Sequence, residues 1–212
     1  MEVDTIAAEV EDKIQDSHYD AAWAIARFNE CLEQIATLCR IPGLQTNAPV
    51  VAAVGGSDVA MPKTYLHDLY LVTSVTYPQG LLIAPNRKEL ILIHDQEQTG
   101  PVEAVCIEGK VLLYRPIPEE AESLTLFFYG KPKELAVGDS FPDYIPPTLQ
   151  KEIFKNYALK EAYMDLEDGI DGVMPNTQKH SALAANAIAA LVEFFPNAPK
   201  AKAEVKRVRV EF

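Results

Sequence analysis

The sequence predicts an α+β fold: a helical bundle with a central antiparallel β region and an extended C-terminal tail. Near the N-terminus and again late in the chain, apolar residues recur at steps of three and four, the period of an amphipathic helix. Between these segments, short runs of alternating apolar and polar residues are separated by glycine and proline, as strands and turns are. The last residues alternate strictly, which indicates an extended tail.

Residues 1–48 are expected to form the N-terminal helices. Asp4 is placed to cap a short first helix, and Ser17 with Asp20 resembles the capping box of a second. One stripe of the second helix contains Ile25, Phe28, Leu32, Ile35 and Cys39. This helix should stop near Pro42, because the residue before a proline avoids the helical conformation. Trp23 lies off the stripe, so it either packs under a loop or lies at a contact surface, where tryptophan is enriched.

Residues 49–135 are expected to form the β region, with short helical inserts. A glycine-rich turn within residues 50–61 predicts a small hairpin. Residues 65–69 are expected to form a single helical turn, and residues 71–77 alternate as a strand. The segment 85–95 combines strand-like composition with Asn86 followed three residues later by glutamate, a helix-capping pattern, and we favour a short helix.

The centre of the chain, residues 103–132, is expected to contain three antiparallel strands. Gly109 provides the first tight turn, and two prolines interrupt the chain before the third strand. The third strand points Leu124, Leu126 and Phe128 to one side and Thr125, Phe127 and Tyr129 to the other. Because both faces are apolar or aromatic, both need a cover. The chain's own helices should supply one cover, and a second subunit is a candidate for the other.

Residues 136–196 are expected to add two C-terminal helices to the same bundle. A linker rich in proline and aspartate precedes them, Thr148 is placed to cap the first helix, and Thr177 the second. The second helix contains six alanines within residues 182–190. Such small side chains allow close helix approach on more than one side.

Residues 197–212 are expected to form an extended basic tail, which begins with a hinge-like break at Asn197-Ala198-Pro199. Its alternation is typical of a segment that adds a strand to the sheet edge of another protein. The residues expected to bind the neighbour or partner in this way are Val205, Arg207, Val208, Arg209, Val210 and Phe212.

The charge of the chain is unevenly distributed. The net charge is −12, yet the last 13 residues hold five basic and two acidic side chains, so they carry +3 and the remainder −15. An acidic body argues against binding the phosphates of nucleic acids, which lysine and arginine contact. It would suit a surface past which DNA slides, although solubility alone also explains it.

Membrane insertion and secretion are not expected. No apolar run reaches the roughly 18 residues of a membrane-spanning helix, and the acidic N-terminus lacks the features of a signal peptide. The three cysteines form no CxxC pair, so neither a disulfide framework nor a zinc site is indicated.

No motif indicates an enzyme, a cofactor or a metal site. The chain contains no GxSxG, P-loop, GxGxxG or HExxH pattern. The acids of residues 165–171 resemble a calcium loop, but Ile170 stands where an EF-hand needs glycine. A small cytosolic hydrolase that uses Cys106 or a histidine is an alternative from a different class. It would need a reactive thiol, whereas Cys106 lies in an apolar strand.

Several segments follow one another in a distinctive order. They are IPGL at 41–44, VAMP at 59–62, NRKEL at 86–90, VLLYRPIP at 111–118, SLTLFFYGKP at 123–132 and IPPTLQKEIFKNYALKEAY at 145–163. In this order they resemble the head-to-tail adaptor (connector) proteins of tailed bacteriophages. The resemblance covers about residues 4–195. Its most specific element is the expected hairpin of the segments VLLYRPIP and SLTLFFYGKP.

The resemblance implies a structural protein of the virion neck, made in the host cytoplasm, that forms a dodecameric ring below the portal protein and lets genomic DNA pass. The helical bundle would contact the portal, and the β region would lead toward the tail nozzle or tail proteins. In such a ring, the residues expected at the subunit interface are Trp23, Phe127, Tyr129, Ala185 and Ala189. Acids expected to face the channel are Glu9, Asp12, Asp165, Glu167 and Asp168. A stopper or tail-completion protein of the same region is the alternative, and a generic cellular protein-binding domain is another.

Overall fold

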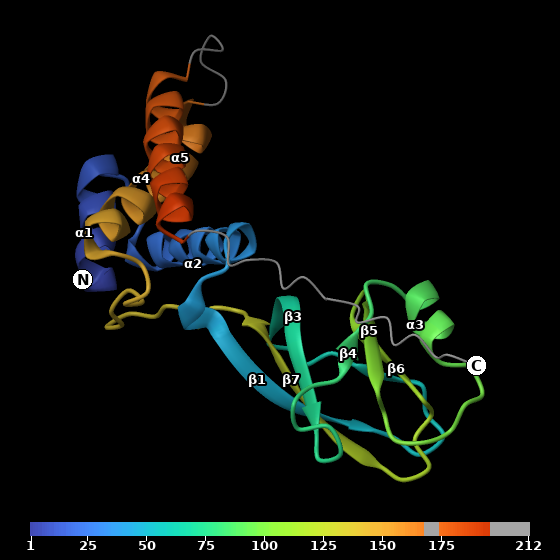
Figure 1. The fold of residues 1–212 in the computed structure, drawn as a ribbon. Coiled ribbons are helices and arrows are strands. Elements are labelled where there is room, and N and C mark those ends of the chain that lie inside the picture. The colour runs from blue at the N-terminus through green and yellow to red at the C-terminus, as the bar shows by residue number, and fades with distance from the viewer. Residues whose placement is uncertain (168–173, 196–212) are drawn as a thin grey trace. The chain divides into compact units, whose positions relative to one another are not determined.

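The computed structural model describes residues 1–167 and 174–195. Within them the chain forms two compact units (Figure 1). The helical unit combines Met1–Leu44 with the described residues between 131 and 195, and the β unit is Gln45–Gly130. The expected fold class is confirmed, since helices and largely antiparallel sheets are segregated along the chain.

The helical unit is built around α4. Its helices are α1 (Val3–Ile14), α2 (Ala21–Leu38), α4 (Pro147–Glu167) and α5 (Pro175–Phe194), with a short 3₁₀ turn, η1, at Pro42–Leu44. Helix α4 contacts the other three helices, and Figure 1 shows α5 running beside it. Because it has neighbours on several sides, α4 buries residues around most of its circumference and lacks a single apolar stripe. These residues are Gln150, Ile153, Phe154, Asn156, Tyr157, Ala158, Leu159 and Ala162.

The stripe predicted for the second helix is confirmed, but the caps predicted at Asp4, Ser17 and Thr148 are wrong. All five stripe residues are buried in α2 or at its C-terminal end. Asp20, and not Ser17, caps α2, because its carboxylate accepts a hydrogen bond from the Trp23 amide at 2.8 Å. Asp4 lies inside α1, where its carboxylate accepts a hydrogen bond from the Gly138 amide at 3.0 Å. Thr148 lies inside α4, which begins at Pro147.

Three phenylalanines form the centre of the helical core. The rings of Phe141 and Phe154 stack with centroids 4.3 Å apart. Phe28 meets both rings from α2 at 5.7 and 5.8 Å. All three side chains are fully buried, so the loop before α4, α4 itself and α2 share one apolar contact.

The β unit consists of two sheets and one short helix. The first sheet has the order β1-β7-β3, and the second has the order β2-β6-β5-β4. Pairing is antiparallel except between β4 and β5. The strands are β1 (Gln45–Ala52), β2 (Asp58–Ala60), β3 (Tyr65–Ser74), β4 (Leu82–Ile83), β5 (Ala104–Glu108), β6 (Val111–Arg115) and β7 (Glu122–Gly130), and the helix is α3 (Arg87–Ile93).

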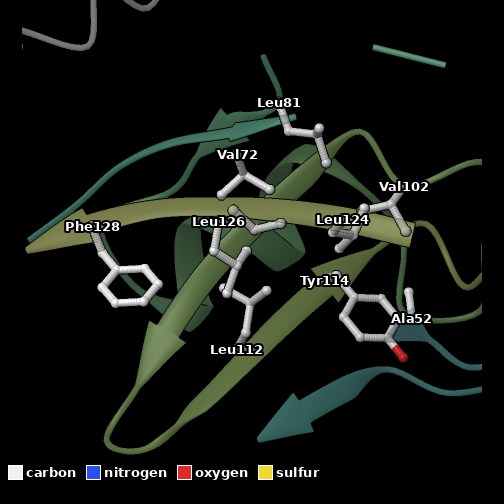
Figure 2. Close-up of a cluster of buried hydrophobic side chains, with 10 residues drawn as sticks. Ala52, Val72, Leu81, Val102, Leu112, Tyr114, Leu124, Leu126 and Phe128 are labelled. Carbon is white, nitrogen blue, oxygen red and sulfur yellow. The ribbon is translucent and has the colours of Figure 1, made fainter. Parts of the chain in front are cut away.

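The core of the β unit lies around the inner face of β7. Figure 2 shows Leu124, Leu126 and Phe128 together with Leu112 and Tyr114 of β6. The Tyr114 hydroxyl accepts a hydrogen bond from the Ala53 amide at 3.1 Å, which pairs this buried polar group. The expectation that helices cover this face of β7 is therefore wrong, because residues of the second sheet pack against it.

The structure confirms the short helix and the β5–β6 turn, and corrects three local predictions. Asn86 caps α3 by accepting a hydrogen bond from the Glu89 amide at 3.0 Å, and Gly109 has the positive φ of 64° that the turn requires. The hairpin expected at 50–61 is absent, since β1 pairs with β7 and β2 with β6. Residues 65–69 belong to β3 instead of a helical turn. The third central strand, β7, pairs with β1 and β3 and not with β6.

Among the helices of the described segments, none has both the length and the apolar character needed to cross a bilayer.

Candidate interaction surfaces

Aromatic side chains gather on the outer face of the first sheet. Tyr70 of β3 lies 6.5 Å from Phe127 and 5.8 Å from Tyr129, measured between ring centroids. His67 stacks on Tyr129 at 5.4 Å. Tyr129 is buried, Phe127 is half-buried, and Tyr70 is 39% exposed. Of the two β7 residues expected at a subunit interface, Phe127 thus retains the larger accessible surface.

Neighbouring positions on this face come from β1. In the register of the sheet, Asn47 pairs with Phe127, Pro49 with Thr125 and Val51 with Ser123. The three β1 residues are exposed, whereas Ala52 on the opposite side is fully buried. The face at these positions is therefore accessible and uncharged, which suits contact with another protein chain.

A bulge in β3 positions the aromatic residues. The register between β3 and β7 shifts on both sides of His67, and Asp68 adopts a left-handed φ of 51°. Non-glycine residues avoid this region unless the surrounding structure holds them there. The bulge brings both His67 and Tyr70 against Tyr129, an arrangement that strict alternation along β3 would not produce.

Trp23 lies half-buried near the start of α2. Its ring meets Tyr19 edge-on at 4.9 Å, and the guanidinium of Arg27 lies 5.8 Å from the ring centroid. Tyr19 belongs to the connection between α1 and α2, so Trp23 packs against a loop residue and still keeps part of its surface exposed.

Ala185 and Ala189 lie on the exposed side of α5. The opposite side of this helix packs against α4 through His180, Ala184, Ala187 and Leu191, all of which are buried. Leu183, at 40%, and Phe194, at 60%, are also exposed. Helix α5 thus presents a largely apolar outer side.

Two of the candidate acids form specific contacts inside the helical unit. Glu9 of α1 forms ion pairs with Lys151 at 2.7 Å and Lys155 at 2.6 Å, both on α4. Its hydrogen bonds with Lys151 and then Lys155 lower the pKa of the Glu9 carboxyl. Asp12 and Asp165 are exposed, so they contribute more accessible negative charge than Glu9 does.

Glu167 joins the end of α4 to the start of α5. One carboxylate oxygen accepts hydrogen bonds from the Thr177 amide at 3.0 Å and hydroxyl at 2.7 Å, and the other accepts two from Asn176. Desolvation raises the pKa of Glu167, but these hydrogen bonds outweigh it and lower the pKa overall. Thr177 therefore contributes a donor within α5 and is not its N-cap, which is Met174.

The remaining sequence-predicted residues lie outside the described part of the chain. These are Asp168 of the acidic cluster and the six tail residues Val205, Arg207, Val208, Arg209, Val210 and Phe212.

The cysteine side chains are buried and poorly suited to nucleophilic chemistry. Burial, with a smaller contribution from Glu108, raises the pKa of the Cys106 thiol. Burial also raises the pKa of Cys31 to about 12. A nucleophilic cysteine needs the thiolate, which these environments disfavour, so the hydrolase alternative loses its proposed nucleophile. Within residues 1–167 and 174–195, no group of three or more histidine, cysteine or acidic side chains is arranged to hold a metal ion.

Sequence reasoning missed an apolar surface on α3. Leu90 packs onto the second sheet, while Leu92 is 70% exposed and Ile93 is 41% exposed. Ile91 and Leu92 line a shallow depression together with Arg87 and Lys88. The run Leu90–Ile93 was the available signal, because four consecutive aliphatic residues cannot all face the sheet from a helix.

Comparison with known proteins identifies one family. The model of the family described as SU10 adaptor protein matches residues 1–207, which spans both units and most of the basic tail. No curated protein matches the chain.

Proposed function

Because the chain belongs to the SU10 adaptor proteins, a family of phage head-to-tail adaptors, we propose that its copies form a ring between portal and tail through which the genome passes. The family itself gives the chain a structural role in the virion neck, with portal and tail proteins as partners. The subunit number proposed for the ring is twelve. The observation that carries the proposal is the family match over residues 1–207.

The distribution of exposed apolar surface supports contact between neighbouring copies. Phe127 and Tyr70 on the first sheet, and Leu183 on α5, retain accessible apolar surface on two separate units. Cyclic rings need heterologous contacts, in which two different surfaces of each subunit meet. We assign the aromatic sheet face, with Phe127 and Tyr129, and the outer side of α5, with Ala185 and Ala189, to such contacts. Trp23 is assigned to the same interface.

The tail is proposed to attach each copy to the portal or to the neighbouring subunit by strand addition. The support is its alternating sequence and its charge of +3 beside a body of −15. Deleting residues 200–212 should abolish binding to purified portal rings while the far-UV spectrum and melting temperature stay unchanged. Since the described residues of each unit bury a core of their own, the deletion variant should fold, and a folded variant that still binds portal rings would contradict this role.

The exposed acids are proposed to keep the channel from binding DNA. Asp12 and Asp165 are the candidates with accessible carboxylates, whereas Glu9 and Glu167 already hold cations or helix amides. Virions that carry D12K and D165K should eject DNA more slowly, because lysines would bind the passing phosphates. The slowing should diminish as salt concentration rises. Ejection at the wild-type rate in low salt would contradict the placement of these acids in the channel.

A further inference from the structure

The outer side of α5 ends in opposite charges. Lys179 lies near its N-terminal end and Glu193 near its C-terminal end, and both are exposed. They are 14 residues apart, close to four helical turns, so they project from the same side of the helix. Within the described residues, neither side chain takes part in an ion pair. Residues 180–192 contain no aspartate, glutamate, lysine or arginine.

The residues between these charges form an accessible face of low polarity. On the same side as Lys179 and Glu193, the helix exposes Ala182, Leu183, Asn186, Ala189 and Ala190. Leu183 is the bulkiest of them and is 40% exposed. Contact with α4 uses the opposite side of the helix, so α4 does not cover this face.

The face is complementary to an antiparallel copy of itself. The exposed residues are arranged symmetrically in sequence about Asn186. The positions seven residues away on either side are Lys179 and Glu193, those four residues away are Ala182 and Ala190, and those three residues away are Leu183 and Ala189. In an antiparallel pair centred on Asn186, the lysine of each copy therefore meets the glutamate of the other, and each leucine meets an alanine. A parallel pair in register would instead bring like charges together.

We propose that two copies of the free protein pair through this face as an antiparallel two-fold dimer. A two-fold contact uses the same patch on both subunits and closes on itself, so it cannot be extended into a ring. The dimer is a form of the protein outside the virion, and it must separate before α5 can contact a neighbour in the ring. The inference rests on the α5 face and does not depend on ring formation.

The pair should be weak and should dissociate readily. One helix–helix contact of about four turns buries less than the roughly 1,200 Å² of total surface found in stable complexes. Attraction between Lys179 and Glu193 therefore largely determines that the pair is antiparallel and not parallel. Because salt screens this attraction, salt should weaken the dimer.

Charge reversal in the full-length protein tests the pairing. We expect K179E and E193K each to weaken the dimer about tenfold in sedimentation equilibrium at low salt, because each reversal places like charges opposite each other twice. The double variant K179E/E193K should restore the wild-type dimer. The matched control is K133E, an equal charge change at a highly exposed lysine elsewhere in the helical unit, which should leave the dimer unchanged.

Crosslinking with a short bismaleimide tests the orientation. The variant N186C should crosslink to itself, and a mixture of A182C and A190C should give the mixed dimer in preference to either like pair. Wild type should remain uncrosslinked, because Cys31, Cys39 and Cys106 are buried. Circular dichroism of each variant checks its fold.

Three results would overturn the proposal. The first is a wild-type protein that stays monomeric at high concentration. If such a protein dimerised only after residues 197–212 were deleted, the chain's own tail, and not a second copy, would occupy the face. The second is a folded double variant that does not regain the dimer. The third is an N186C variant that forms an oligomer but does not crosslink to a second copy of itself.

Discussion

The contact between His180 and Asn156 shows how single residues fasten α5 to α4. The Nδ1 atom of His180 lies 2.8 Å from the Asn156 Oδ1 atom, and the Asn156 amide nitrogen donates to the Glu152 carbonyl. Because the Asn156 amide nitrogen donates to this carbonyl, the Asn156 Oδ1 atom faces His180 as an acceptor. A neutral imidazole with its proton on Nδ1 donates to it. The imidazole also stacks on Tyr163 at 5.5 Å between centroids. Both His180 and Asn156 are buried.

This contact should make stability depend on pH. Burial lowers the pKa of His180 from its ordinary 6.5, and Lys179, Lys13 and Lys155 add to the effect. Below pH 6.5 the unfolded chain therefore binds the proton more readily than the folded one, and the free energy of unfolding falls as pH falls. We expect the free energy of unfolding, measured by urea denaturation, to fall by at most about 1.4 kcal/mol per pH unit as the pH drops below 6.5.

Two glutamine variants separate this histidine from other titrating groups. H180Q should lose the slope just below pH 6.5, whereas H18Q, at an exposed histidine, should keep it. The lowered pKa values of Glu9 and Glu167 act in the same direction but at more acidic pH, below their ordinary 4.5. A slope that persists in H180Q would show that His180 is not the group responsible.

At the level of single residues, the sequence predicted which side chains are buried better than it predicted what a polar side chain contacts. The apolar stripe of α2 is buried as its spacing requires, because a helix fixes which residues share a face. Glu167 is expected to face the channel, and in addition its carboxylate accepts hydrogen bonds from the first turn of α5. The sequence could not reveal these hydrogen bonds, since they depend on how the end of α4 meets the start of α5.

At the scale of elements, the helical core is the most sensitive to substitution. Phe154 on α4 is fully buried and contacts Phe28 and Phe141, which come from two other segments. We expect F154A to lower the free energy of unfolding by about 3–5 kcal/mol, because it removes a large apolar side chain and leaves a cavity.

The matched control for this core variant is F194A, at a phenylalanine of α5 that is 60% exposed. It should change the free energy of unfolding by less than about 0.5 kcal/mol in the same urea titration. Similar losses in the two variants would contradict the assignment of the helical core.

The strands show where prediction from local sequence ends. The β5–β6 turn was found because Gly109 lies between adjacent strands that pair with each other. The neighbours of β1, β2 and β7 were not found, since each pairs with a strand distant in sequence. Turn signals such as Gly55 mark where the chain changes direction, but burial of side chains between two sheets decides which strands pair.

At the scale of the whole molecule, one unit is inserted within the other. The β unit begins at Gln45 and ends at Gly130, and Gln45 pairs with Tyr129 across β1 and β7. Its two ends are therefore adjacent, so the helical unit can continue after the insertion with little distance to span. Each unit has its own buried core, which suits a protein whose two units are proposed to meet different partners.

Electron microscopy of the full-length protein bound to portal rings tests the ring most directly. We expect additional density on the tail side of the portal, in which about twelve copies stand side by side around an open channel. Deletion of residues 200–212 should remove that density. Isolated copies scattered on the portal, or a portal that gains no density while the protein is folded and in excess, would contradict the central claim.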